Sequence, residues 1–224
     1  MEPKRIRGSE EAATESSPGI EQRLIVIPSQ PSFDPYEHKP HVVKLYGEIT
    51  EESCGEVIES LYEMRELSKE VELVDPEDPE SETVVKYNPF ELLISTEGGL
   101  VADMFAVYDV MKHLQQDVEI GTFGVGKVAS AGVLLLAAGT KGKRKIGKNC
   151  SVMIHEISGG EFGSVKEIKN GTKQIQKIRS QYIDALVENT KMSRKKVLYY
   201  FRKHVDIYFT AEEALKHGIV DEIV

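Results

Sequence analysis

An alternation of apolar strands and helices across the middle of the chain restricts its fold more than any other feature. The sequence predicts strands at Glu91–Ser95, Val118–Phe123 and Ser151–Ile154, with helices at Leu100–Gln115 and from Ser130 onward. Such alternation favours parallel βαβ units, because each crossover helix returns the chain to the same end of the sheet. We therefore expect an α/β fold whose functional groups lie at the carboxyl ends of its strands.

Further elements flank this central alternation. Before it, we expect a first strand at Val42–Tyr46 and a helix from Thr50 onward. After it, we expect a long amphipathic helix at Ser164–Thr190 and a shorter helix at Arg194–Lys203. A last helix, opened by a capping box, follows from Thr210 onward, and a final strand covers Ile219–Val224. The apolar stripe of Ser164–Thr190 is longer than one small core needs, so we expect this helix to form an oligomer contact.

Composition divides the chain into three segments. Residues 1–22 have almost no apolar content and are expected to form a disordered arm, residues 23–41 are a Pro-rich N-terminal segment, and residues 42–224 form the main domain. Within that domain lies an acidic insertion at about 66–88. We expect the insertion to be a solvated loop, and a negatively charged docking patch is the alternative.

Charge and cysteine content exclude several functional classes. A net charge of −9 argues against binding to nucleic acid or to a membrane surface. The N-terminus lacks the apolar run of a secretory signal, and no segment reaches the length of a membrane span. Two cysteines, Cys54 and Cys150, do not make a disulfide framework or a metal site. We therefore expect a cytoplasmic protein that binds neither nucleic acid nor membrane.

Ser130 is the strongest candidate for a chemical role. Small residues surround it in Gly126–Gly132 and an apolar run follows, which places its hydroxyl at the first turn of a buried helix. A serine at a helix start is more often a simple cap. However, His155 ends an apolar strand and Asp206 precedes the last helix. A hydroxyl becomes a nucleophile when an imidazole that is oriented by a carboxylate accepts its proton.

Acyl transfer also needs two hydrogen-bond donors for the oxyanion. Gly98 and Gly99 lie at a strand-to-helix turn, where a backbone N–H can approach a ligand closely because glycine lacks Cβ. The N–H of Ala131, directly after the candidate nucleophile, can supply the second donor.

Several segments of the chain resemble the ClpP family, the proteolytic subunits of the ATP-dependent Clp protease. The resemblance runs from about Val42 to Val224 and is densest in Val107–Met111, Ala129–Gly132, Ala137–Arg144, Val152–His155 and Thr210–Ala214. It implies a ClpP/crotonase-like fold with a protruding handle helix at Ser164–Thr190. It also implies that Ser130 is the nucleophile, His155 the base and Asp206 the orienting acid.

The resemblance extends to substrate and partners. It implies oxyanion donors at Gly99 and Ala131, and we expect Gly98 and Glu156 to contact the substrate. The implied activity is that of a serine endopeptidase, which hydrolyses unfolded proteins inside a chamber of stacked heptameric rings with a Clp-type ATPase unfoldase as partner. Neither a metal nor an organic cofactor is implied. Two alternatives remain, a catalytically silent ring scaffold and a crotonase-type acyl-CoA enzyme.

The chain departs from the family pattern beside the candidate site. The usual Ser-Pro-Gly-Gly turn is Thr96-Glu97-Gly98-Gly99, and the usual Gln-Pro after the histidine is Glu156-Ile157. The strand before Ser130 is about two residues longer. None of these differences removes a catalytic group.

Overall fold

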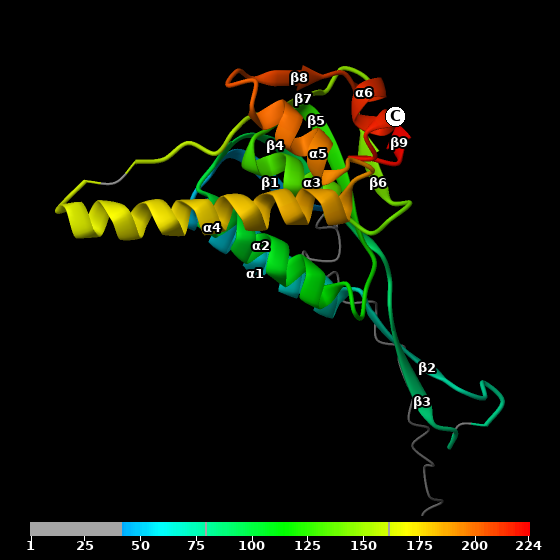
Figure 1. Cartoon of the computed structure of the whole chain (residues 1–224). Helices are drawn as coiled ribbons and strands as arrows, with labels where there is room; N and C mark the ends of the chain where they lie inside the picture. The colour runs from blue at the N-terminus through cyan, green and yellow to red at the C-terminus, as the bar shows by residue number, and fades with distance from the viewer. Residues whose placement is uncertain (1–41, 79, 161) are drawn as a thin grey trace, which may run out of the picture. The chain divides into compact units, whose positions relative to one another are not determined.

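The computed structural model describes residues 42–78, 80–160 and 162–224. The arm expected at 1–22 and the Pro-rich segment at 23–41 lie outside these residues. The described part is an α/β fold on a mostly parallel sheet, as the sequence predicts (Figure 1). Among the described residues, no helix has both the length and the apolar character that a membrane crossing requires.

Seven strands form the main sheet, and five of them follow the order β1-β4-β5-β6-β9. These five strands are β1 (Val42–Ile49), β4 (Phe90–Gly99), β5 (Ile120–Ala129), β6 (Arg144–Ile146) and β9 (Glu222–Ile223). Strand β7 (Ser151–Ile154) pairs with β5, and β8 (Ile207–Phe209) pairs with β7. The β7–β8 pair is antiparallel, whereas the others in this sheet are parallel. The carboxyl ends of β4, β5 and β7 therefore meet at one edge.

Six helices belong to the described part of the chain, and the third of them lies at its centre. They are α1 (Glu51–Leu67), α2 (Val101–Leu114), α3 (Ala131–Ala137), α4 (Val165–Asn189), α5 (Arg194–Phe201) and α6 (Ala211–Lys216). Every residue of α3 is buried, and the helix packs on β4, β5, α2 and α4 (Figure 1). A helix in that place must be apolar on all sides, which is the pattern of the run after Ser130.

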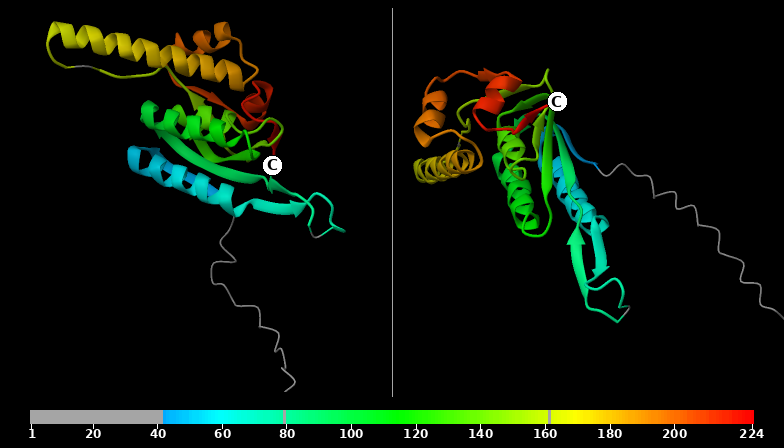
Figure 2. Two further views of the ribbon diagram at one scale, coloured as in Figure 1. Left: turned by 90° about the horizontal axis from the view of Figure 1, so that it is seen from below. Right: turned by 90° about the vertical axis from the view of Figure 1, so that its right-hand side faces the viewer.

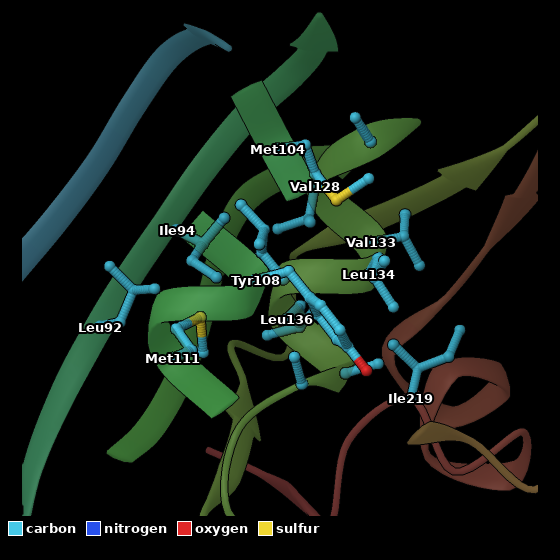
Figure 3. Packing of buried hydrophobic residues seen from close by; sticks show 14 of the residues in the cluster. Leu92, Ile94, Met104, Tyr108, Met111, Val128, Val133, Leu134, Leu136 and Ile219 are labelled. Carbon is cyan, nitrogen blue, oxygen red and sulfur yellow. The ribbon is translucent and has the colours of Figure 1, made fainter. Parts of the chain in front are cut away.

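The core joins β4, α2 and α3. Leu92 and Ile94 of β4 lie near Met104 and Met111 of α2, and all four side chains are fully buried (Figure 3). Val128 of β5 and the leucines of α3 complete this cluster. This packing fixes the start of α3 at the carboxyl ends of β4 and β5, and Ser130 lies there.

The acidic insertion is not the loop that the sequence predicts. Residues Lys69–Leu73 (β2) and Thr83–Tyr87 (β3) form an antiparallel hairpin that extends away from the main sheet (Figures 1 and 2). Val71 pairs with Val85 across the hairpin, and Lys86 forms an ion pair with Glu72. Cross-strand apolar and charged pairs stabilise the hairpin although its strands are largely exposed.

Several strands differ from their predicted extents. The first two predicted strands run further than expected, β1 to Ile49 and β4 to Gly99. Strand β5 begins at Ile120 and runs to Ala129, well beyond the predicted end at Phe123. The short strands β6 and β8 were not predicted, because three residues are too few to show an apolar alternation. The final strand, expected at Ile219–Val224, is reduced to Glu222–Ile223.

Candidate active site

Ser130 lies on a sharp turn between β5 and α3. Its backbone has φ 53° and ψ −122°, a left-handed conformation that costs a non-glycine residue about 1–3 kcal/mol and clusters at functional sites. The Ser130 N–H donates to the Met153 carbonyl of β7 at 2.8 Å, which ties the turn to the neighbouring strand. The Ser130 side chain caps no N–H group of α3 among the described residues. Its hydroxyl is therefore available for another contact.

His155 makes that contact. It directly follows β7, whose Met153 pairs with Ala129 of β5, so the histidine and Ser130 leave adjacent strands at the same edge. His155 Nε2 lies 2.7 Å from Ser130 Oγ, which is hydrogen-bond distance. The imidazole side chain is 33% exposed and is thus accessible to a substrate.

Asp206 lies on the far side of the imidazole, with its Oδ1 3.4 Å from His155 Nδ1. The β7–β8 register explains this placement. Ile154 pairs with Ile207, so the residue after Ile154 and the residue before Ile207 lie opposite each other in the antiparallel ladder. If Nδ1 carries its proton toward Asp206, Nε2 is the nitrogen that can accept a proton from Ser130.

Two glycines bring the end of β4 against Ser130. Gly98 has φ +95°, and a Cβ there would lie 2.6 Å from Ser130 Cβ. Gly99 has φ +151°, and a Cβ there would lie 2.1 Å from the Ile49 carbonyl oxygen. Both positions therefore require glycine. The Gly98 N–H donates to Oγ1 of the buried Thr96 at 3.0 Å, so a side chain that departs from the family pattern holds the turn.

The strand that leads to Ser130 carries a bulge. Ile94 pairs with Gly124 and Thr96 pairs with Val128, so β5 advances four residues while β4 advances two. Lys127, within this bulge, forms an ion pair with Glu97. Glu97 stands at the proline position of the family turn. The two departures from the family pattern, the longer strand and the glutamate in place of proline, therefore contact each other beside the glycine turn.

Helix α4 contacts the site through two residues one turn apart. The Tyr182 hydroxyl donates to the Ser130 carbonyl at 2.8 Å. Arg179 binds Glu156, the residue after His155, through two N–H groups at 2.8 and 2.7 Å. Neither contact can be predicted from the sequence, because Tyr182 belongs to the apolar stripe of the helix and nothing in the spacing links α4 to the turn.

A pocket of about 220 Å³ opens beside the imidazole. It is lined by His155, Glu156, Ile157, Ser158, His204, Val205 and Asp206. Among the described residues, no group of three or more His, Cys, Asp or Glu side chains is placed to hold a metal ion. The structure thus brings Ser130, His155, Asp206, Gly98 and Ala131 into one neighbourhood, with Glu156 at its rim.

A comparison with known protein families gives a match over most of the described chain. The Clp protease family model matches residues 81–224. The chain belongs to the Clp protease family. The matched range includes every candidate site residue, whereas β1, α1 and β2 precede it. Membership of the Clp protease family supports a peptidase activity.

Proposed function

We propose that this chain is a serine endopeptidase with Ser130 as nucleophile, His155 as general base and Asp206 as the acid that orients His155. One observation carries the proposal: His155 Nε2 lies 2.7 Å from the hydroxyl of a serine in a strained backbone conformation. Proton transfer from a serine to an imidazole requires this contact. The contact counts against a catalytically silent scaffold, and a crotonase-type acyl-CoA enzyme would have no need of it.

In the proposed reaction, Ser130 Oγ attacks the scissile carbonyl carbon while His155 Nε2 takes the hydroxyl proton. The carbonyl electrons move to oxygen, and the N–H groups of Gly99 and Ala131 stabilise the oxyanion. Collapse of this intermediate breaks the C–N bond, and the leaving amine takes the proton from His155. A water molecule then gives His155 a proton and attacks the acyl ester carbon. When the ester C–O bond breaks, His155 returns the proton to Ser130 Oγ and the peptide leaves as a carboxylic acid. Ala131 is the first residue of α3, so its N–H has no acceptor within that helix, which supports its role.

We propose that the substrate backbone passes Gly98 and Glu156. A Cβ at residue 98 would lie 3.2 Å from Ser130 Oγ, so glycine leaves the approach to the hydroxyl open. Glu156 lines the pocket beside His155, and Arg179 already holds both of its carboxylate oxygens. Glu156 would therefore contact the substrate while it remains paired with Arg179.

Assembly into stacked heptameric rings is the second part of the proposal. The buried residues of α4 begin only at Tyr182. Near its start, Phe162 is 97% exposed, Val165 84% and Ile168 41%. Apolar side chains gathered at such exposure mark a binding surface. We propose that the handle helix of a second copy covers it.

A Clp-type ATPase that unfolds protein substrates is the proposed partner of this chamber. The acidic β2–β3 hairpin offers an alternative docking patch. Deletion of Asp75–Glu82 should leave cleavage of short peptides unchanged, because the hairpin tip contributes no candidate catalytic residue. A loss confined to ATPase-stimulated proteolysis supports docking at the hairpin. If neither assay changes, the hairpin is not a docking site.

The proposed activity is tested with a fluorogenic short peptide. Wild-type protein should cleave it, and Ser130→Ala should lose activity about a thousandfold or more, because the triad acts as a unit. Ser60→Ala on α1 is the matched control, since its hydroxyl donates to the Glu56 carbonyl of the same helix. Full peptidase activity in folded Ser130→Ala would refute the proposal. Turnover of a CoA thioester that survives Ser130→Ala would favour the acyl-CoA alternative.

A further inference from the structure

Tyr182 is buried directly behind the candidate nucleophile. Its side chain is 3% exposed and stacks on Phe201 of α5, with ring centroids 6.1 Å apart and planes 14° from parallel. This packing aims the hydroxyl at the Ser130 carbonyl, to which it donates at 2.8 Å. Burial raises the pKa of Tyr182, so the hydroxyl keeps its proton and remains a donor across the working pH range.

The Ser130 carbonyl belongs to the same peptide unit as the Ala131 N–H. That unit is planar and trans, so its C=O and N–H point in opposite directions. Any contact that fixes the direction of the carbonyl therefore also fixes the direction of the Ala131 N–H. In this turn the angle that sets the orientation of the unit is the ψ of Ser130, which is −122°. With a φ of 53°, this conformation lies outside the broadly allowed regions and needs support from its surroundings.

Two donors provide that support. The Val133 N–H of α3 donates to the Ser130 carbonyl at 3.1 Å, and the Tyr182 hydroxyl donates to the same oxygen at 2.8 Å. The first bond comes from the helix that follows the turn, whereas the second comes from a residue of α4 that lies 52 positions later in the chain. Donation to the carbonyl also polarises the peptide unit, which makes its N–H a stronger donor.

We propose that Tyr182 is a positioning residue for the oxyanion hole. Its hydroxyl holds the Ser130–Ala131 peptide in the orientation that directs the Ala131 N–H toward the developing oxyanion. This inference rests on the proposed serine peptidase function and adds to it a residue outside the triad. The contribution is made in the transition state, so it affects turnover and not the binding of the ground-state substrate.

Tyr182→Phe tests the proposal, because it removes the hydroxyl and retains the ring that stacks on Phe201. Complete loss of one oxyanion donor costs about 100- to 1,000-fold in kcat. Tyr182→Phe leaves the Ala131 N–H present but less well directed, so we expect kcat for a short peptide to fall about tenfold or more. KM should change by less than about twofold. Labelling of Ser130 by a fluorophosphonate, whose phosphoryl oxygen occupies the same hole, should slow by a similar factor.

Tyr200→Phe is the matched control. Its hydroxyl lies 2.9 Å from His217 Nε2, so this variant also removes one tyrosine hydroxyl and its hydrogen bond, but away from the turn. It should keep wild-type kcat and labelling rate. All rates are expressed per Ser130 labelled at completion, so that an unfolded fraction does not contribute.

Two results would overturn the inference. One is a Tyr182→Phe variant with the kcat and labelling rate of the wild type. The other is a rise in KM at unchanged kcat, which would assign Tyr182 to substrate binding. Failure of the underlying function is recognised separately, because the wild type itself would then neither cleave the peptide nor be labelled at Ser130.

Discussion

Arg179 on α4 and Glu156, the residue after His155, form a two-point ion pair. Arg179 Nε donates to Glu156 Oε1 at 2.8 Å and Nη2 donates to Oε2 at 2.7 Å. Such a bidentate pair fixes the planes of both groups. Glu156 Oε1 also accepts from the Ile157 N–H at 3.1 Å. The handle helix therefore restrains the segment that carries the candidate base.

Arg179→Met, which keeps much of the side-chain stem, should loosen this segment. We expect the free energy of unfolding to fall by about 1 kcal/mol, because the pair is partly exposed, and kcat to fall several-fold. A double-mutant cycle with Glu156→Gln measures the coupling between the two side chains. Arg194→Met, which breaks an exposed pair with Asp184, is the control and should leave kcat unchanged. Strictly additive effects of the two substitutions on kcat would contradict this role.

Asp206→Asn should retain the shape of the site and permit the wrong imidazole tautomer. We expect kcat to fall by about 1,000- to 10,000-fold, as for an orienting acid in a serine triad. Asp184→Asn is the control, because that carboxylate pairs with Arg194 and does not face His155. Peptide kinetics at neutral pH provide the measurement. A nearly wild-type kcat in Asp206→Asn would show that another group orients the base.

Arg144 and Asp221 hold the C-terminal strand to the body of the domain. Arg144 is buried and donates to Asp221 through Nε at 2.7 Å and Nη2 at 2.5 Å. Its Nη1 also donates to the carbonyls of Ala137 and Asn189, at the ends of α3 and α4. The hydrogen bonds from Arg144 lower the pKa of Asp221 below its ordinary value of 3.8.

This shift gives a defined dependence of stability on pH. The pKa of Asp221 is lower in the folded state than in the unfolded state. Its contribution to the free energy of unfolding is therefore complete above the pKa of the unfolded state, and it is lost as the pH falls through the pKa of the folded state. At pH 7, Asp221→Asn should lower the free energy of unfolding by about 3 kcal/mol, since it leaves a buried guanidinium without its counter-charge. The difference from wild type should shrink below about pH 4. Urea denaturation of the full chain at fixed protein concentration measures it, and a difference that stays constant into acid would contradict the assignment.

Ile168→Glu should separate the proposed assembly. It places a charge in the exposed apolar stripe of α4, where a partner helix would have to bury it. We expect light scattering at micromolar concentration to report a smaller particle than for the wild type. Asn170→Asp introduces the same change of charge at an exposed position of the same helix and should leave the mass unchanged. A wild-type chain of monomeric mass would refute the ring assembly directly.

The sequence was sufficient for those parts of the site that depend on one strand or one helix. Ser130 and His155 each follow an apolar strand, and that pattern is visible without the fold. The position of Asp206 depends on the pairing of β8 with β7, and a three-residue strand leaves no periodic signal. The Tyr182 and Arg179 contacts depend on the packing of α4 against the turn, which no local pattern encodes. The hairpin is not evident from the sequence, because acidic residues and prolines outnumber the few apolar residues of its two strands.

The most direct test of the central claim is the reaction of the purified full chain with a fluorophosphonate probe. Mass spectrometry of the digested protein then locates the labelled residue. The account predicts one labelled serine, Ser130, with labelling abolished in Ser130→Ala and strongly slowed in His155→Ala. Absence of labelling in folded, active protein, or labelling of a different serine that persists in Ser130→Ala, would contradict it.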